Sequence, residues 1–100
     1  MIFMLDKQSL TVLDMEYDSL THIMRIFILW NGIEHVISTE LIQYISDNGR
    51  IRAFGSDEFS AFIMNFMNIE DRTKKIKNLY KIIWDYAENK DSVKFPVRII

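Results

Sequence analysis

His22 and His35 supply the only imidazoles in the sequence for acid–base chemistry or metal binding. A catalytic histidine needs a partner within hydrogen-bond reach, and a metal site needs several converging ligands. In the strand register derived below, His22 lies opposite Met15 and His35 opposite Ile28, too far apart to share a metal. We interpret both as partly buried structural histidines, and a small enzyme that pairs one of them with a carboxylate is the alternative.

Other residue types give no pattern of a reactive site. There is no cysteine, so a thiol nucleophile and a zinc–thiolate site are excluded. The three glycines stand alone rather than in a phosphate-binding loop. Two adjacent carboxylate pairs, Asp57-Glu58 and Glu70-Asp71, fall in predicted first helical turns, where acids stabilise the helix dipole. We therefore expect no catalytic residue, no metal and no cofactor.

A basic cluster in the second half of the chain is the one pattern that suggests nucleic acid. It consists of Arg72, Lys74, Lys75, Lys77 and Lys81. At helical spacing Lys74, Lys77 and Lys81 share one face, which could contact phosphates together with Arg72. No aromatic side chain is interleaved with them, so a solvated helix face is the preferred interpretation.

Composition indicates one globular domain spanning residues 1–100. Hydrophobic residues make up 49% of the chain and charged residues 26%, which is typical of a folded domain rather than a disordered segment. The net charge is −2, with seven acidic against two basic side chains in residues 1–49 and ten basic against seven acidic in residues 50–100. Neither a signal peptide nor a membrane span is evident, so we expect a cytoplasmic protein without a membrane partner.

The strongest structural signal is a β-hairpin at Asn31-Gly32. Both residues tolerate the positive φ that a two-residue type I′ turn requires, and apolar residues flank them. The register would pair Trp30 with Ile33, Ile28 with His35 and Ile26 with Ile37. Residues 10–17 add an earlier strand to this antiparallel meander, and residues 1–5 a further short one.

The rest of the chain suggests three helices and a closing strand, which gives an α+β fold. Ser38-Thr39-Glu40 could cap a first helix that ends at Asn48-Gly49. Residues 50–54 form a connector or a strand, residues 56–58 begin a second helix, and a third runs from a cap at Asn68 to about Glu88. Residues 93–100 read as an edge strand, because Pro96 cannot donate to a sheet ladder.

Alternation along the meander assigns the side chains to two faces. The face with the histidines, Met15, Met24 and Ile26 is the expected core. The opposite face mixes apolar and acidic groups, including Val12, and monomers rarely leave such a patch uncovered. The candidate protein interface comprises Asp14, Glu16, Ile23, Phe27, Leu29, Glu34 and Val36.

These patterns favour a non-catalytic protein-binding module over an enzyme. The sharper hypothesis is a small inhibitor of another macromolecule, of the immunity-protein, antitoxin or phage counter-defence type, because an acidic surface can occupy a basic cleft. The partner would be another protein or a second copy of the chain. Nucleic-acid binding through the basic third helix is the alternative.

Overall fold

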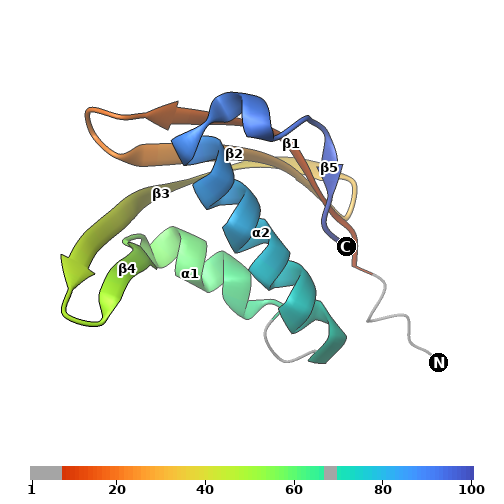
Figure 1. Ribbon diagram of the computed structural model, residues 1–100. Helices are drawn as coiled ribbons and strands as arrows, with labels where there is room; N and C mark the ends of the chain where they lie inside the picture. The colour runs from red at the N-terminus through yellow and green to blue at the C-terminus, as the bar shows by residue number, and fades with distance from the viewer. Residues whose placement is uncertain (1–7, 67–69) are drawn as a thin grey trace.

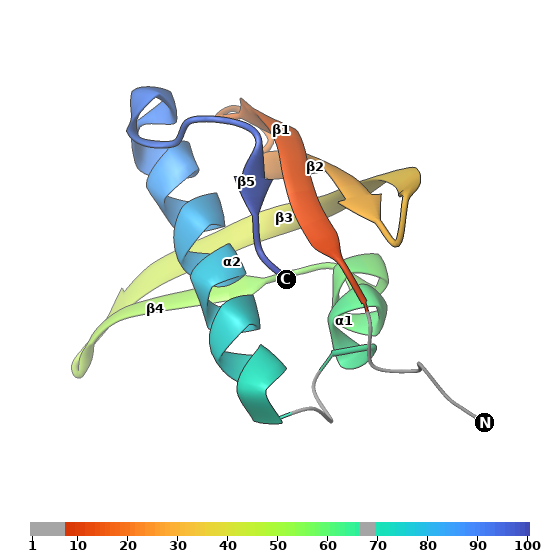
Figure 2. The same cartoon turned by 90° about the vertical axis from the view of Figure 1, so that its right-hand side faces the viewer.

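The computed structural model describes residues 8–66 and 70–100, without the side chains of residues 70–72. Five strands form one antiparallel sheet in the order β4-β3-β2-β1-β5, which curls around two helices. The elements in chain order are β1 (Leu10–Asp18), β2 (Ile23–Trp30), β3 (Ile33–Ser46), β4 (Gly49–Phe54), α1 (Asp57–Met64), α2 (Glu70–Glu88), a 3₁₀ turn (Lys90–Ser92) and β5 (Val97–Arg98). Both helices lie on the concave side of this half-barrel (Figures 1 and 2).

The hairpin at Asn31-Gly32 is confirmed. Asn31 and Gly32 have φ angles of 53° and 84°, as a type I′ turn requires. Trp30 pairs with Ile33, Ile28 with His35 and Ile26 with Ile37, in the predicted register. This turn fixes which β2 and β3 side chains share a face.

A β-bulge in β1 changes part of the face assignment. The register shifts between Val12 and Asp14, so one extra residue separates the two halves of the strand. Val12, expected on the outer face, is therefore fully buried, while Met15 stays in the core. Simple alternation fails here because a bulge moves all residues on one side of it to the other face.

The first predicted helix is wrong, because residues 38–46 continue β3 as a strand. Buried Ile37, Thr39 and Leu41 alternate with exposed or half-buried neighbours, which is the period of a sheet. Gly49 does adopt a positive φ of 111°, but it closes the β3–β4 hairpin opposite Ser46. Residues 49–54 are accordingly a strand, β4.

The other two helices exist, and the closing strand is shorter than predicted. Ser56 caps α1, its Oγ accepting a hydrogen bond from the Phe59 amide at 3.2 Å. α2 ends at Glu88 as expected, while the proposed cap at Asn68 and the strand at residues 1–5 lie outside the described residues. The last segment has regular strand pairing at Val97–Arg98, at the sheet edge beside β1, and Ile99 and Ile100 add backbone hydrogen bonds to Leu10.

The fold is thus α+β only in a loose sense, and the expectation of a meander followed by three helices is wrong. The core lies between the concave side of the sheet and the helices. α2 contributes Ile76, Leu79 and Ile83, each at most 1% exposed. Tyr86 of the same helix donates a hydrogen bond to the Met15 carbonyl at 2.9 Å, which anchors α2 on β1.

Candidate functional site

The predicted interface residues lie on the convex side of the sheet, away from both helices (Figure 1). The register places Phe27 beside Asp14 and Val36, Leu29 beside Glu34, and Ile23 beside Glu40. We call the outward side chains of β1–β4 the convex face. Its predicted members are exposed or half-buried: Asp14, Glu16, Ile23, Phe27, Leu29, Glu34 and Val36.

Carboxylates surround the apolar centre of the convex face. Asp14, Glu16 and Asp18 come from β1, and Glu34 and Glu40 from β3. Among them, Arg25 pairs with Glu16 at 3.4 Å and lies over the Phe27 ring at 5.6 Å. Arg98 of β5 lies on the same side of the sheet, opposite Thr11, at the edge next to β1. The face is therefore apolar in the middle and acidic at its margin.

Three apolar residues of the convex face were missed by sequence reasoning. Ile42 and Tyr44 of β3 and Ile51 of β4 point to the same side as Val36, and Tyr44 is 55% exposed. Ile42 and Tyr44 were missed because the capping pattern predicts a helix that ends at Asn48-Gly49, and Ile51 because residues 50–54 are expected to form a connector or a strand with no assigned partner. The signal that could have found them is residue type, because isoleucine and tyrosine favour strands; strict alternation is absent, since Leu41-Ile42 and Tyr44-Ile45 are adjacent apolar pairs.

The histidines are not in the core, which corrects our interpretation. His22 is exposed in the β1–β2 turn with a left-handed φ of 62°, and the residue opposite Met15 is Ile26. Its Nδ1 lies 3.3 Å from the Tyr17 hydroxyl. His35 is exposed at the β2–β3 hairpin and contacts the Trp30 ring. The two side chains do not converge.

His22 borders a cleft that we call the edge cleft. It has a volume of about 410 Å³. Tyr17 and His22 belong to the β1–β2 hairpin, and Trp84, Ala87 and Glu88 to the last turns of α2. The remaining wall is a continuous stretch of β3, residues 40–43. Glu40 and Glu88 line the same cleft, and among the described residues no hydrogen bond joins the His22 side chain to a carboxylate.

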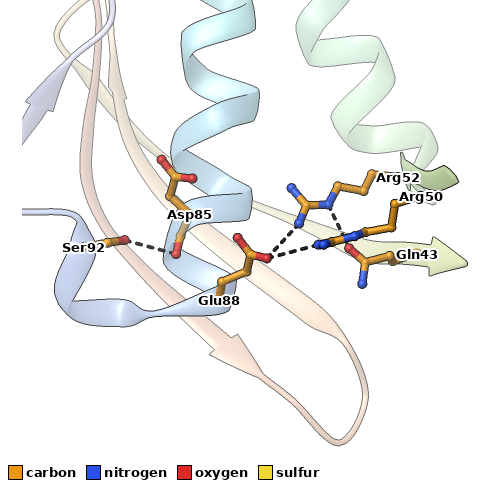
Figure 3. Close-up of polar contacts among 6 residues, drawn as sticks. All are labelled: Gln43, Arg50, Arg52, Asp85, Glu88 and Ser92. Carbon is orange, nitrogen blue, oxygen red and sulfur yellow. Dashed lines mark hydrogen bonds and ion pairs between the residues drawn. The ribbon is translucent and has the colours of Figure 1, made fainter. Parts of the chain in front are cut away.

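A polar network fastens β4 to the end of α2 beside this cleft (Figure 3). Glu88 accepts from Arg52 at 2.8 Å and from Arg50 at 3.4 Å. Arg52 also donates to Gln43 at 2.8 Å and stacks over the Trp84 ring at 4.8 Å. These contacts hold the β3–β4 hairpin against the helix.

The basic residues of α2 remain a solvent-facing set. Lys74, Lys77 and Lys81 are exposed, and Lys81 pairs with Asp85 at 2.7 Å. The Arg72 side chain lies outside the described residues. Within the described ranges, no three His, Asp or Glu side chains gather to hold a metal ion. No helix in those ranges is long and apolar enough to cross a bilayer.

Two pKa shifts mark the β1 end of the molecule. Hydrogen bonding from the Leu20 amide is the main cause of the lowered pKa of Asp18; desolvation opposes it, and Thr21 and His22 lower the pKa further. Burial raises the pKa of Tyr86, and nearby carboxylates raise it further. Both arise from structural contacts.

Comparison with known proteins gives no family, since neither a protein-family model nor a curated protein sequence matches the chain.

Proposed function

We propose that the protein is a non-catalytic protein-binding module that uses its convex face. The observation that carries this is the position of both helices on the other side of the sheet, so that in the described part of the chain Val36 is exposed and Phe27 and Leu29 are half-buried. An apolar centre with a charged rim is the usual composition of a protein interface. Ile42, Tyr44 and Ile51 extend the apolar surface along β3 and β4.

The acidic rim favours a basic partner over a second copy of the chain. Two convex faces brought together would place clusters of carboxylates against each other, and such like-charge contacts cost several kcal/mol. A partner with basic side chains around an apolar site would instead be attracted and oriented before contact. The function we propose is therefore inhibition of another macromolecule by covering a basic site, as immunity proteins, antitoxins and phage counter-defence proteins do.

The test compares wild type with Phe27→Asp and, as a control, with Lys77→Asp on the helix side. Proteins that co-purify from the native host with wild type are produced in pure form, and their affinities for the three chains are measured by calorimetry. We expect Phe27→Asp to weaken binding at least about thirtyfold, as for a central anchor residue, and added salt to slow association. Circular dichroism checks that the variant folds.

Three outcomes would contradict the proposal. Equal affinity for wild type and Phe27→Asp would place the interface elsewhere. A wild-type dimer in sedimentation that Phe27→Asp dissociates would show self-association instead. Loss of binding in Lys77→Asp alone, with a nucleic acid in the captured material, would favour the basic face of α2.

A further inference from the structure

The long strand β3 changes partners near its middle. Ile33–Glu40 pairs with β2 along one edge, and Leu41–Ser46 pairs with β4 along the other. Each half therefore has one edge that faces no strand of the described residues. The first of these edges meets α1, where the Ser38 amide donates to Glu58 at 3.1 Å. The second edge, at residues 41–45, borders the edge cleft.

His22 ends the ladder between β2 and β3. The Leu41 amide still donates to the His22 carbonyl at 2.7 Å. In a continued antiparallel ladder the His22 amide would return a bond to the Leu41 carbonyl. The left-handed His22 backbone instead directs its amide to the Asp18 carbonyl, also at 2.7 Å. Within the described residues, the Leu41 carbonyl thus receives no backbone amide.

Alternation fixes which backbone groups follow along that edge. Amides and carbonyls of successive residues point to opposite edges of a strand. The backbone amide and carbonyl of Leu41 point toward β2. Those of Glu40 point toward β4, where the Glu40 carbonyl accepts a hydrogen bond from the Gly55 amide at 2.9 Å. The backbone amides and carbonyls of Gln43 and Ile45 must then point in the same direction as those of Leu41, toward the edge of β3 that has no neighbouring strand. They have no backbone hydrogen-bond partner on that edge among the described residues.

We propose that the edge cleft binds an extended polypeptide segment, which adds a short strand to β3 at Leu41, Gln43 and Ile45. Only a backbone in β conformation supplies amides and carbonyls at the spacing of these free groups. Tyr17, Trp84 and Leu41 line the cleft and can take one apolar side chain of the segment. This site adjoins the convex face at Glu40 and Ile42, but it opens elsewhere, between the β1–β2 turn, β3 and the end of α2.

The probe is a displayed library of random heptapeptides, selected on the full chain. The peptide enriched most is synthesised, and its affinity is measured for wild type, Ile45→Pro and Ile45→Ala. Ile45 is 85% exposed and its amide does not bond to β4, so proline there removes one free donor and leaves the β3–β4 ladder in place. We expect Ile45→Pro to weaken binding roughly tenfold and Ile45→Ala by less than about threefold.

A second measurement does not depend on how the proline variant folds. N-methylation of alternate peptide residues removes the amides that would bond to β3 in one register, and methylation of the intervening residues removes those that point away. One series should abolish binding and the other should leave it unchanged. In wild type, bound peptide should slow amide exchange at Gln43 and Ile45. Failure to enrich any peptide, equal effects of both series, or protection confined to other residues would overturn the proposal.

Discussion

At the scale of single residues, the backbone conformations at the two ends of β2 decide where the hydrogen-bond ladder between β2 and β3 continues and where it stops. Asn31 and Gly32 accept positive φ and so continue the ladder into β3. His22 also has a positive φ, but its amide turns back to Asp18 and the ladder stops there. A positive φ thus closes a hairpin at Asn31-Gly32, whereas at His22 it ends the ladder and leaves the cleft open.

Gly32 offers a direct measure of that conformational requirement. A Cβ at this position would meet no atom within 4 Å, so Gly32→Ala changes only the backbone preference. Since φ is 84°, we expect a loss of about 1 kcal/mol in the free energy of unfolding. Gly32→Asn should lose less, because asparagine visits the left-handed region more readily. Urea denaturation of the three proteins tests this, and equal losses for Ala and Asn would show another cause.

Asp18 gives the β1–β2 turn a dependence on pH. The Leu20 amide holds its pKa below the ordinary value of 3.8, so the ionised carboxylate is favoured in the folded state. Because the pKa of Asp18 is lower in the folded state, the ionised carboxylate stabilises the folded protein at pH values above the unfolded-state pKa. This contribution to stability is lost as the pH falls through the folded-state pKa. We expect Asp18→Asn to unfold at a lower temperature than wild type at pH 7.

The difference in melting temperature between the two proteins should shrink as the pH falls below about 4, because the Asp18 carboxylate of wild type is then progressively protonated. Glu34→Gln, which removes one carboxylate from β3, controls for the change in net charge. A gap for Asp18→Asn that stays constant down to pH 2 would contradict the assignment.

At the scale of elements, the β3–β4 hairpin beyond Ile42 is a two-stranded ribbon whose main tie to the domain is side-chain contact with α2. Arg50 and Arg52 both reach Glu88. Only Arg52 also bonds to Gln43 and stacks on Trp84. The two arginines, two residues apart on one strand, therefore differ in what they hold.

Arg52→Ala should accordingly destabilise the protein more than Arg50→Ala. We expect roughly 1–2 kcal/mol for Arg52, from its hydrogen bonds and ring contact together. For Arg50 we expect only a few tenths of a kcal/mol, as for an exposed ion pair. Chemical denaturation measures both, and the Arg52 loss should persist at high salt because stacking is screened little. Equal losses would mean that the Trp84 contact contributes nothing.

The same region shows why sequence patterns predicted only part of the fold. The Asn31-Gly32 turn was predictable because its chemistry is local and nearly unique to type I′ hairpins. Residues 38–49 carry a capping sequence and an Asn-Gly ending that suit a helix equally well. Pairing with β2 makes residues 38–40 a strand, and pairing with β4 continues that strand through residues 41–46. Local propensity cannot register a partner that lies later in the chain.

The residues of the candidate site also differ in how far local sequence could place them. Phe27, Leu29 and Val36 could be placed on the outer face because they adjoin the turn that fixes the register. Val12 could not, since the bulge beside it depends on packing. The edge cleft was invisible to sequence reasoning, because it arises where three segments far apart in the chain meet.

At the scale of the whole molecule, stability should be uneven. Strand β2 is paired on both sides and its inward residues are buried, while the ribbon beyond Ile42 is paired on one edge and extends from the domain (Figure 1). The Cα extents of 51 × 28 × 23 Å reflect this elongated shape. Regions with few buried contacts open at lower free energy than the core.

Amide hydrogen exchange compares these regions on equal terms. Ile26–Ile37 in the core and Tyr44–Ile51 in the ribbon are both pairs of the hydrogen-bonded type, so any difference reports opening rather than a missing bond. We expect Tyr44 and Ile51 to exchange at least about a hundredfold faster than Ile26 and Ile37, which corresponds to opening at roughly 3 kcal/mol less free energy. Arg52→Ala should widen this gap, because it loosens the ribbon without touching β2. Equal protection of the four amides would show instead that the ribbon unfolds only with the whole domain, and the free edge of β3 would then be a rigid feature of the native state.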